Sequence, residues 1–303
     1  MNIQNGNGVK VLSVLGLIVT TIIWGSAFVV MKNSVNVISP TYLLALRFSI
    51  ASFALVAVFW KKIKTIRKSD CISGGLLGVF LFLSYLLQTY GLKYTTASKN
   101  AFITTLYVIL VPFLHWFINR KKPSANNMSA AVLAVVGLAL ISLEGDFSVN
   151  IGDILTLICG FFFAVHIVFI DRYTKKHDPV ILTVIQMIGA AVLSWILAPF
   201  LEGAQDFSVI NGSMVVGLLY LGVFSTMLCF LLQNVGQKYL SPGTSSIILS
   251  FEAVFGLGFA VIFLSEPVTF KLILGCVLMF ISILLAEFKR KEAPCPDQTS
   301  SCS

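Results

Sequence analysis

The sequence predicts an all-α membrane protein of ten transmembrane helices, and three observations lead to this fold class. Of the 303 residues, 57% are hydrophobic and only 11% are charged, whereas soluble domains are about one quarter charged. Apolar runs of roughly 20 residues, the length that crosses a bilayer as a helix, follow one another along the chain. Most charges lie in the short loops between these runs, and the cations favour every second loop.

Ten segments are apolar enough to span a bilayer, each with ends defined to within a few residues. The first, 11–31, is too long for the apolar core of a typical signal peptide and is interpreted as a spanning helix. Only a tight turn fits into 93–96, between the third and fourth segments. The ten segments are 11–31, 42–60, 72–92, 97–118, 128–143, 152–170, 180–200, 213–235, 243–264 and 270–288.

The loop charges predict an orientation. Five cations lie within 61–68, three in 120–122 and three in 172–176, whereas the loops on the other side are mainly acidic. Because positive residues are retained in the cytoplasm, both ends are predicted to be cytoplasmic, with residues 1–10 as a short N-terminus and 289–303 as a disordered tail. The net charge of +8 follows from this loop bias, so the expected partner is the lipid bilayer and not nucleic acid.

The two halves of the chain resemble each other, which indicates an internal repeat. Residues 85–94 match residues 230–239 at six of ten positions. We assign residues 11–145 to the first repeat and 151–288 to the second, with five helices in each. Since five is odd, the second copy enters the membrane from the other side, and such inverted repeats suit alternating access. The alternative is a duplicated scaffold that moves nothing. Corresponding positions include Pro40 with Pro179, Trp24 with Phe163, Arg47 with Gln186, and Gln88 with Gln233.

Several short motifs resemble the EamA family of the drug/metabolite transporter superfamily. They are Trp-Gly-Ser-Ala-Phe at 24–28, Arg47, the Gln-x-x-Gly-x-x-Tyr segment at 88–94, Glu-Ala-Val at 252–254 and Ser-Glu-Pro at 265–267. The resemblance covers about residues 11–288 as two EamA-type repeats. It implies a ten-helix bacterial carrier of the cytoplasmic membrane, often an exporter of amino acids or related metabolites, with a central cavity between the repeats. The first repeat departs from the second by carrying Tyr107 where the second has Glu252, which leaves one carboxylate in the core.

Three ionisable residues stand out inside the predicted helices: Arg47, His166 and Glu252. Each costs about 2.5–3.5 kcal/mol at a helix centre on insertion scales, so each is a candidate for function. Glu252 can bind a proton or a cationic substrate group in turn, or be a protonated side chain that only joins helices. Arg47 can hold a substrate carboxylate, or snorkel to the interface or pair with an acid such as Glu144. His166 can be an interhelical hydrogen-bond donor, or act with Asp171, a spacing used by some membrane acyltransferases.

Uncharged polar residues form stripes, one helical turn apart, on the predicted third, fourth, eighth and ninth helices. Polar groups need partners inside a membrane, so these stripes face either other helices or a wet cavity. We predict one central cavity between the four helices, with Trp24 and Phe163 added by the first and sixth. The alternative is close helix packing through small residues. The predicted substrate-binding residues are Trp24, Arg47, Gln88, Asn100, Thr104, Tyr107, Phe163, His166, Gln186, Gln233, Ser245 and Glu252.

These patterns favour a secondary active transporter of a small molecule. The chain has no Walker A loop and no dinucleotide motif, so we expect an ion gradient to drive it, with Glu252 as the proton-coupling residue and with no cofactor, metal or catalytic residue. The hypothesis is a proton-coupled exporter of amino acids or related small metabolites. Alternatives are an efflux carrier for drugs or organic cations, a membrane-embedded transferase, and a sensor or scaffold. A homodimer is left open, and six cysteines without a C-x-x-C pair predict no disulfide framework.

Overall fold

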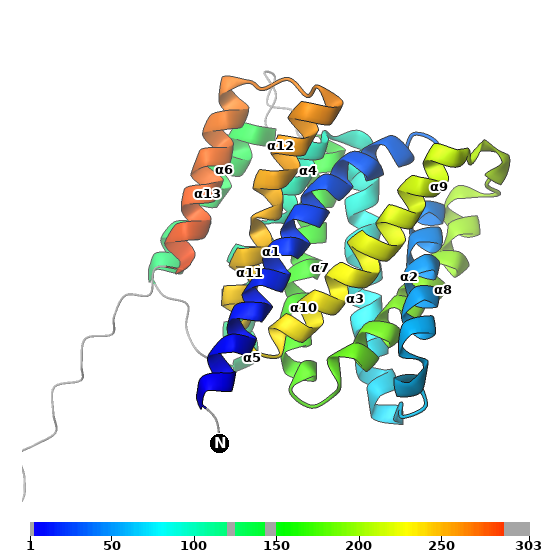
Figure 1. Cartoon of the computed structure of the whole chain (residues 1–303). Helices are drawn as coiled ribbons and strands as arrows, with labels where there is room; N and C mark the ends of the chain where they lie inside the picture. The colour runs from blue at the N-terminus through cyan, green and yellow to red at the C-terminus, as the bar shows by residue number, and fades with distance from the viewer. Residues whose placement is uncertain (1–2, 120–124, 143–149, 288–303) are drawn as a thin grey trace, which may run out of the picture.

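The computed structural model describes residues 3–119, 125–142 and 150–287, and every regular element within these ranges is a helix (Figure 1). One of them, η2, has the wider turns of a π-helix. The elements are α1 (Ile3–Ser34), α2 (Pro40–Ile63), α3 (Lys68–Tyr94), α4 (Ala97–Thr104), α5 (Tyr107–Asn119), α6 (Ala125–Ser142), α7 (Ile151–Thr174), α8 (Pro179–Glu202), η1 (Phe207–Val209), α9 (Gly212–Leu219), η2 (Tyr220–Leu228), α10 (Cys229–Gln237), α11 (Pro242–Ser250), α12 (Glu252–Leu264) and α13 (Phe270–Glu287).

Eight helical runs among the described residues are long and apolar enough to cross a bilayer, so the chain is an all-α, multi-pass membrane protein. Helices α6 and α13 occupy the predicted fifth and tenth segments, although they are not among these eight, so the count of ten stays a prediction. The predicted turn at 93–96 agrees with the boundary between α3 and α4. The eight runs are Gly8–Ser34, Pro40–Ile63, Lys68–Tyr94, Ala97–Phe117, Ile151–Thr174, Pro179–Glu202, Gly212–Gln237 and Pro242–Leu264.

Two of the predicted continuous helices are broken near their middle. The fourth divides into α4 and α5, and the ninth into α11 and α12, with Phe251 at the second break. At each break the backbone forms tighter hydrogen bonds between residues three apart, as from Leu106 N–H to Ile103 O and from Phe251 N–H to Ile248 O. The second half of each broken helix begins at a corresponding position, Tyr107 in α5 and Glu252 in α12.

Helices from the two halves of the chain pack against each other throughout the bundle. Helix α3 lies against α7 and α8, α1 against α10 and α12, α2 against α8 and η2, and α4 against α7 and α12. Helices α6 and α13 form a pair at one side of the bundle (Figure 1). At the crossing of α1 and α12, Gly25 allows the closest approach, since a Cβ atom there would lie 2.5 Å from Phe255 Cβ.

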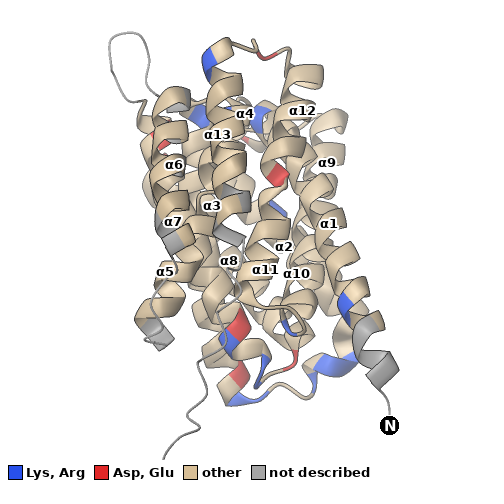
Figure 2. Ribbon diagram, turned by 90° about the vertical axis from the view of Figure 1, so that its left-hand side faces the viewer, with Lys and Arg blue, Asp and Glu red and all other residues tan. Residues whose placement is uncertain are grey.

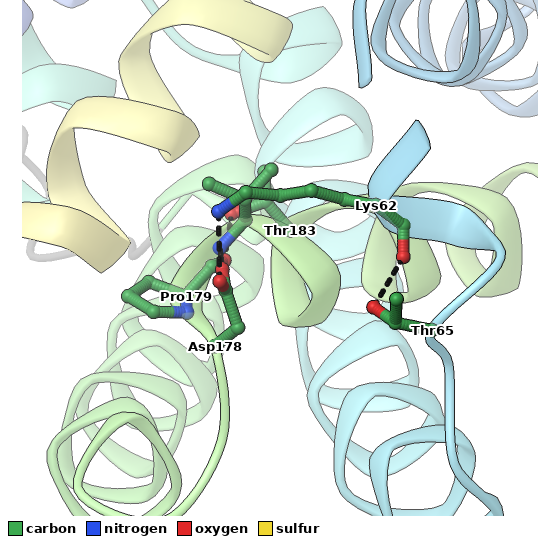
Figure 3. A network of polar contacts seen from close by, with 6 residues as sticks. Lys62, Thr65, Asp178, Pro179 and Thr183 are labelled. Atoms are coloured by element: carbon green, nitrogen blue, oxygen red, sulfur yellow. Dashed lines mark hydrogen bonds and ion pairs between the residues drawn. The ribbon is translucent and has the colours of Figure 1, made fainter. Parts of the chain in front are cut away.

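The two ends of the bundle differ in charge. Many Lys and Arg residues gather at the end near the N-terminus, here called the basic face, and fewer at the other end, called the opposite face (Figure 2). At the basic face, Lys62 of α2 forms a 2.7 Å ion pair with Asp178, which caps α8 through Val180 N–H (Figure 3). Partial burial acts to raise the pKa of Asp178, but its hydrogen bonds with Lys62 and Val180 N–H outweigh this and lower it. His177 also contacts Asp70 at 2.5 Å, so the loop before α8 is tied to α2 and α3.

Candidate functional site

A cavity lies in the middle of the bundle, and the space within it that water-sized molecules can occupy is about 30 Å³. Both halves of the chain line it, and seven of the twelve predicted binding residues are in its wall: Trp24, Arg47, Gln88, Tyr107, Phe163, Gln233 and Glu252. The predicted lining came from the third, fourth, eighth and ninth helices with Trp24 and Phe163 from the first and sixth. The cavity wall also includes Arg47 of α2, three further residues of α1 and one further residue of α7. The other lining residues are Ala27, Phe28, Met31, Tyr85, Ile167, Ser225 and Leu249.

Arg47 is completely buried in the cavity wall, so the snorkelling interpretation is wrong. Its guanidinium donates hydrogen bonds to Thr226 Oγ1 at 2.9 Å and Ser225 Oγ at 3.2 Å, and it also contacts Met31 Sδ. It lies 4.5 Å from the ring centroid of Tyr85, a cation–π contact. All these partners are neutral, and no described residue forms an ion pair with Arg47; Glu144 lies outside the described residues. The site therefore contains a buried positive charge without a described counter-ion.

The π-helical segment η2 shapes this part of the site. It presents the successive hydroxyls of Ser225 and Thr226 to Arg47, and the Ser225 carbonyl accepts a 2.8 Å hydrogen bond from Trp24 Nε1. Thr226 Oγ1 donates in turn to Leu221 O, five residues back. Segments of π-helix within α-helices are rare and often occur at functional sites. Sequence analysis predicted a regular helix here, because local residue preferences do not distinguish a π turn from an α turn.

Glu252 is the acidic residue of the cavity wall. It is 4% exposed, it lies in the first turn of α12, and it forms no ion pair with any described residue. Tyr107 occupies the corresponding place at the start of α5 and also lines the cavity, and its hydroxyl lies near the Glu252 carboxyl without a hydrogen bond of ordinary geometry to any described residue. The start of a helix carries a partial positive charge and the end of one a partial negative charge. The two breaks therefore bring helix ends of both signs to the middle of the bundle.

The other five predicted residues are buried but do not line the cavity. Two of them support Gln88, since Thr104 Oγ1 accepts from Gln88 Nε2 at 3.2 Å and Asn100 Nδ2 donates to Gln88 O at 3.2 Å. His166 and Gln186 contact each other at 3.1 Å behind the wall. Ser245 Oγ has no partner among the described residues. Contact of any of these five with a substrate stays a prediction.

The structure does not form the suggested pair of His166 and Asp171. Asp171 pairs with Lys175 at 2.7 Å on the last turn of α7, while His166 contacts Gln186 of α8. Positions five apart on a helix point about 140° apart at 3.6 residues per turn, which accounts for their different partners.

Several residues of the cavity wall follow sequence patterns that could have identified them as lining residues. Trp24, Ala27, Phe28 and Met31 follow the spacing of one helix face, and Tyr85 begins the repeated segment 85–94. An apolar stripe of this kind is more often core than binding site, so only the tertiary arrangement separates the two. Ser225, by contrast, depends on the turn geometry of η2 to reach the cavity wall.

At the opposite face, hydrogen bonds from several other elements hold the turn between α3 and α4, and this set of contacts is here called the clamp. Lys32 at the end of α1 donates to Leu92 O at 2.7 Å and to Thr95 O at 2.6 Å. Thr95 Oγ1 donates to Asp153 of α7 at 2.6 Å, and Glu266 accepts from Ala97 N–H at 2.6 Å at the start of α4. The residue before Glu266 adopts a left-handed conformation, with φ of 53°, which turns the chain back toward α4.

The corresponding turn at the basic face has fewer contacts. Between α10 and α11, Ser241 caps its own helix by accepting from Thr244 N–H at 3.1 Å. Across the described residues, no side chain from another helix hydrogen-bonds to 238–241. The two faces therefore differ in how firmly their helix turns are held.

The fold defines a multi-pass helical membrane protein with a central cavity lined by both halves of the chain, an arrangement found in transporters. The model of the EamA-like transporter family matches residues 11–143 and 150–288. The chain therefore belongs to the EamA family, within the drug/metabolite transporter superfamily.

Known relatives agree with this assignment. An uncharacterized transporter of the archaeon Archaeoglobus fulgidus is 33% identical over 275 residues, which cover 91% of this chain and 85% of the relative. The uncharacterized transporter YoaV of Bacillus subtilis is 25% identical over 281 residues, covering 90% and 96%. A solved crystal structure superposes with a TM-score of 0.69 at 15% identity, over 93% of this chain and 96% of the other, and shows the same fold.

Proposed function

We propose that this protein is a secondary active transporter that carries amino acids or related small zwitterions out of the cell in exchange for protons. The observation that carries the proposal is the cavity shared by both halves of the chain, which is lined by one basic residue, Arg47, and one acidic residue, Glu252. We place the protein in the cytoplasmic membrane of a bacterium, although the archaeal relative shows that the family is wider.

The two charges account for the substrate class. The guanidinium of Arg47 has the fork geometry that recognises a carboxylate, and Glu252 can accept hydrogen bonds from an ammonium group. Charges buried in a protein are costly unless they are paired, and a zwitterion supplies one partner for each. Trp24 and Phe163 in the wall provide apolar surface for a substrate side chain.

Glu252 can also couple transport to protons. A carboxylate that binds an ammonium group from one side of the membrane and a proton from the other holds only one of them at a time. Substrate leaving in one direction is then exchanged for a proton moving in the other. In this mechanism Glu252 alone couples the substrate to the proton, and no other charged residue takes part.

Alternating access between two inverted five-helix repeats explains the packing. If α1, α2, α3, α4–α5 and α6 correspond to α7, α8, α9–α10, α11–α12 and α13, the main interhelical contacts occur in matched pairs. The contact of α3 with α7 corresponds to the contact of α10 with α1. The contacts of α2 with α8 and of α6 with α13 each join two corresponding helices, so the exchange of the two halves leaves them unchanged. The matched breaks in α4–α5 and α11–α12 fit the same scheme.

This scheme gives ten spans, with both termini on the basic face. The positive-inside bias makes the basic face cytoplasmic. The clamp around the turn between α3 and α4 then closes the outer face, and the loosely held turn between α10 and α11 lies at the face from which an exported substrate enters. A homodimer stays a prediction.

Efflux of drugs or other organic cations is a second candidate, and the aromatic wall beside Glu252 favours it. A monovalent cation would pair with Glu252 but would add to the unpaired charge of Arg47. An amino acid carries a partner for both charges, which makes it the better match.

The test is transport by purified protein in sealed liposomes, screened with radiolabelled amino acids and with radiolabelled tetraphenylphosphonium as the organic cation. We expect proton-gradient-driven transport of one or more amino acids, with collapse on addition of a protonophore and loss in Glu252→Gln. Transport that ignores the protonophore and the Glu252→Gln change would refute proton coupling. Transport of the organic cation alone would favour the second candidate.

A further inference from the structure

Five polar side chains lie on the helices α7, α8 and α10, outside the cavity. They are His166, Thr183, Gln186, Asn234 and Gln237, and each is completely buried. This group, here called the polar file, includes two predicted binding residues, His166 and Gln186, that do not line the cavity. None of the five is used in the proposed transport cycle.

The contacts place the polar file in order along the bundle. His166 Nε2 lies 3.1 Å from Gln186 Oε1, and Asn234 Nδ2 donates to Thr183 Oγ1 at 2.7 Å. Thr183 and Gln186 are three residues apart on α8, as are Asn234 and Gln237 on α10, so each pair shares a helix face. From Gln186 to the start of α8 is seven residues, about 10 Å along the helix axis.

One end of the polar file meets the cavity and the other meets the basic face. Ile167 and Gln233, the neighbours of His166 and Asn234 in the chain, both line the cavity. At the other end, Thr183 donates to the carbonyl of Pro179, the first residue of α8, and Gln237 is the last residue of α10. The polar file thus crosses the half of the bundle between the cavity and the basic face.

Many polar atoms of the file have no hydrogen-bond partner among the described residues. They are His166 Nδ1, Gln186 Nε2, Asn234 Oδ1, and both Oε1 and Nε2 of Gln237. An unsatisfied polar group inside a membrane protein costs several kcal/mol. Five such atoms lie in the polar file, and the described side chains do not supply hydrogen-bond partners for them.

Rearranging the side-chain amides does not remove the problem. Turning over the Gln186 amide exchanges acceptor for donor toward His166, but one amide atom and one imidazole nitrogen still lack partners. Water both donates and accepts, and buried water binds where two to four polar groups converge. On the other side of α8, the seam with α3 and α7 is apolar, with Leu77, Ile170 and Leu182 completely buried.

We propose that the polar file binds a chain of internal water molecules that connects the central cavity to the basic face. The ligands of this water are His166, Gln186, Asn234 and Gln237. The path gives the charges of the cavity contact with solvent while the clamp at the opposite face is closed. If the proposed proton exchange holds, it is also a route by which protons reach Glu252 without passing through the substrate.

The test uses protein with ¹⁵N-labelled histidine in lipid bilayers, studied by solid-state NMR with transfer of magnetisation from water. The chain has three histidines, and the His166 signal is assigned by its loss in His166→Gln. We expect water transfer to the His166 ring at a rate within a few-fold of that to His177, which lies at the basic face. This measurement requires no transport and no known substrate, so its failure is separate from failure of the proposed function.

Asn234→Leu replaces a polar side chain of the file with an apolar one of similar size, and it should slow the transfer to His166 several-fold. Ser194→Ala removes a buried polar group of α8 outside the file, where Ser194 Oγ donates only to Ala190 O of its own helix, and it should leave the rate unchanged. Gln237→Leu is a second file variant, used if Asn234→Leu is not monodisperse. Absence of transfer to His166 in the unaltered protein overturns the proposal, and so does an unchanged rate in the folded file variants.

Discussion

Replacement of Arg47 by Met should abolish substrate binding with at most a small loss of stability. The guanidinium loses its hydrogen bonds to Thr226 and Ser225, but removal of a buried charge in favour of an apolar group of similar size is often neutral or stabilising by about 1–4 kcal/mol. Thr226 Oγ1 keeps its bond to Leu221 O, and Ser225 Oγ loses one donor, at a cost of about 1 kcal/mol. The balance lies between a loss of about 1 kcal/mol and a gain of about 3 kcal/mol.

The control is Thr226→Val, which keeps the arginine and removes one of its partners. A charged group left without a hydrogen bond costs about 1–3 kcal/mol or more, so this variant should unfold at a lower temperature. Unfolding can be followed with a thiol-reactive dye, because Cys159, Cys229 and Cys276 are free and buried. If Arg47→Met lowers stability by the 3–5 kcal/mol typical of a broken buried ion pair, Arg47 is structural and its assignment to the substrate is wrong.

Two further predictions concern packing and charge. Gly25→Ala places a Cβ atom within 3.0 Å of the backbone of α12 and should lower stability by about 1–3 kcal/mol, whereas Gly75→Ala, which has no atom within 4 Å of its new Cβ, should be neutral or slightly stabilising in the same dye assay. Asp178→Asn should cost at most about 1 kcal/mol at pH 7, because Asn also caps helices and the pair with Lys62 is exposed. Folding lowers the pKa of Asp178. The stability that the Asp178 carboxylate contributes is therefore fully present above about pH 4, its pKa in the unfolded chain, and is lost as the pH falls through the folded pKa. A stability difference between the two proteins that grows in acid would contradict this prediction.

Composition and apolar run length were sufficient to predict an all-helical membrane protein. These features act on whole segments, since about 20 apolar residues are needed wherever a helix crosses lipid. The same reasoning could not find the breaks at Thr105–Leu106 and Phe251 or the π-helix in 220–228. Each is a local choice of hydrogen bond that depends on the packing of neighbouring helices.

The candidate site was predicted best where residue chemistry is costly in a membrane. Arg47 and Glu252 were selected because each is an ionisable group in an apolar segment, and both line the cavity. The same rule selected His166, which lies behind the wall. A helical stripe indicates which side of a helix faces the bundle interior, but it does not indicate how far each side chain lies from the cavity. Asn100 and Thr104 therefore face the interior and contact Gln88, but they do not line the cavity.

The central claim is that the cavity holding Arg47 and Glu252 opens to each side of the membrane in turn. Leu249 lines this cavity and is completely buried, so Leu249→Cys, made with Cys71, Cys295 and Cys302 replaced by Ser, reports its access to membrane-impermeant thiol reagents. We predict that Cys at position 249 is labelled from the basic face when the clamp is unaltered. When Glu266→Gln weakens the clamp, we predict that the same position is also labelled from the opposite face. Labelling confined to one face in both proteins, or absent from both faces, would contradict alternating access through this cavity.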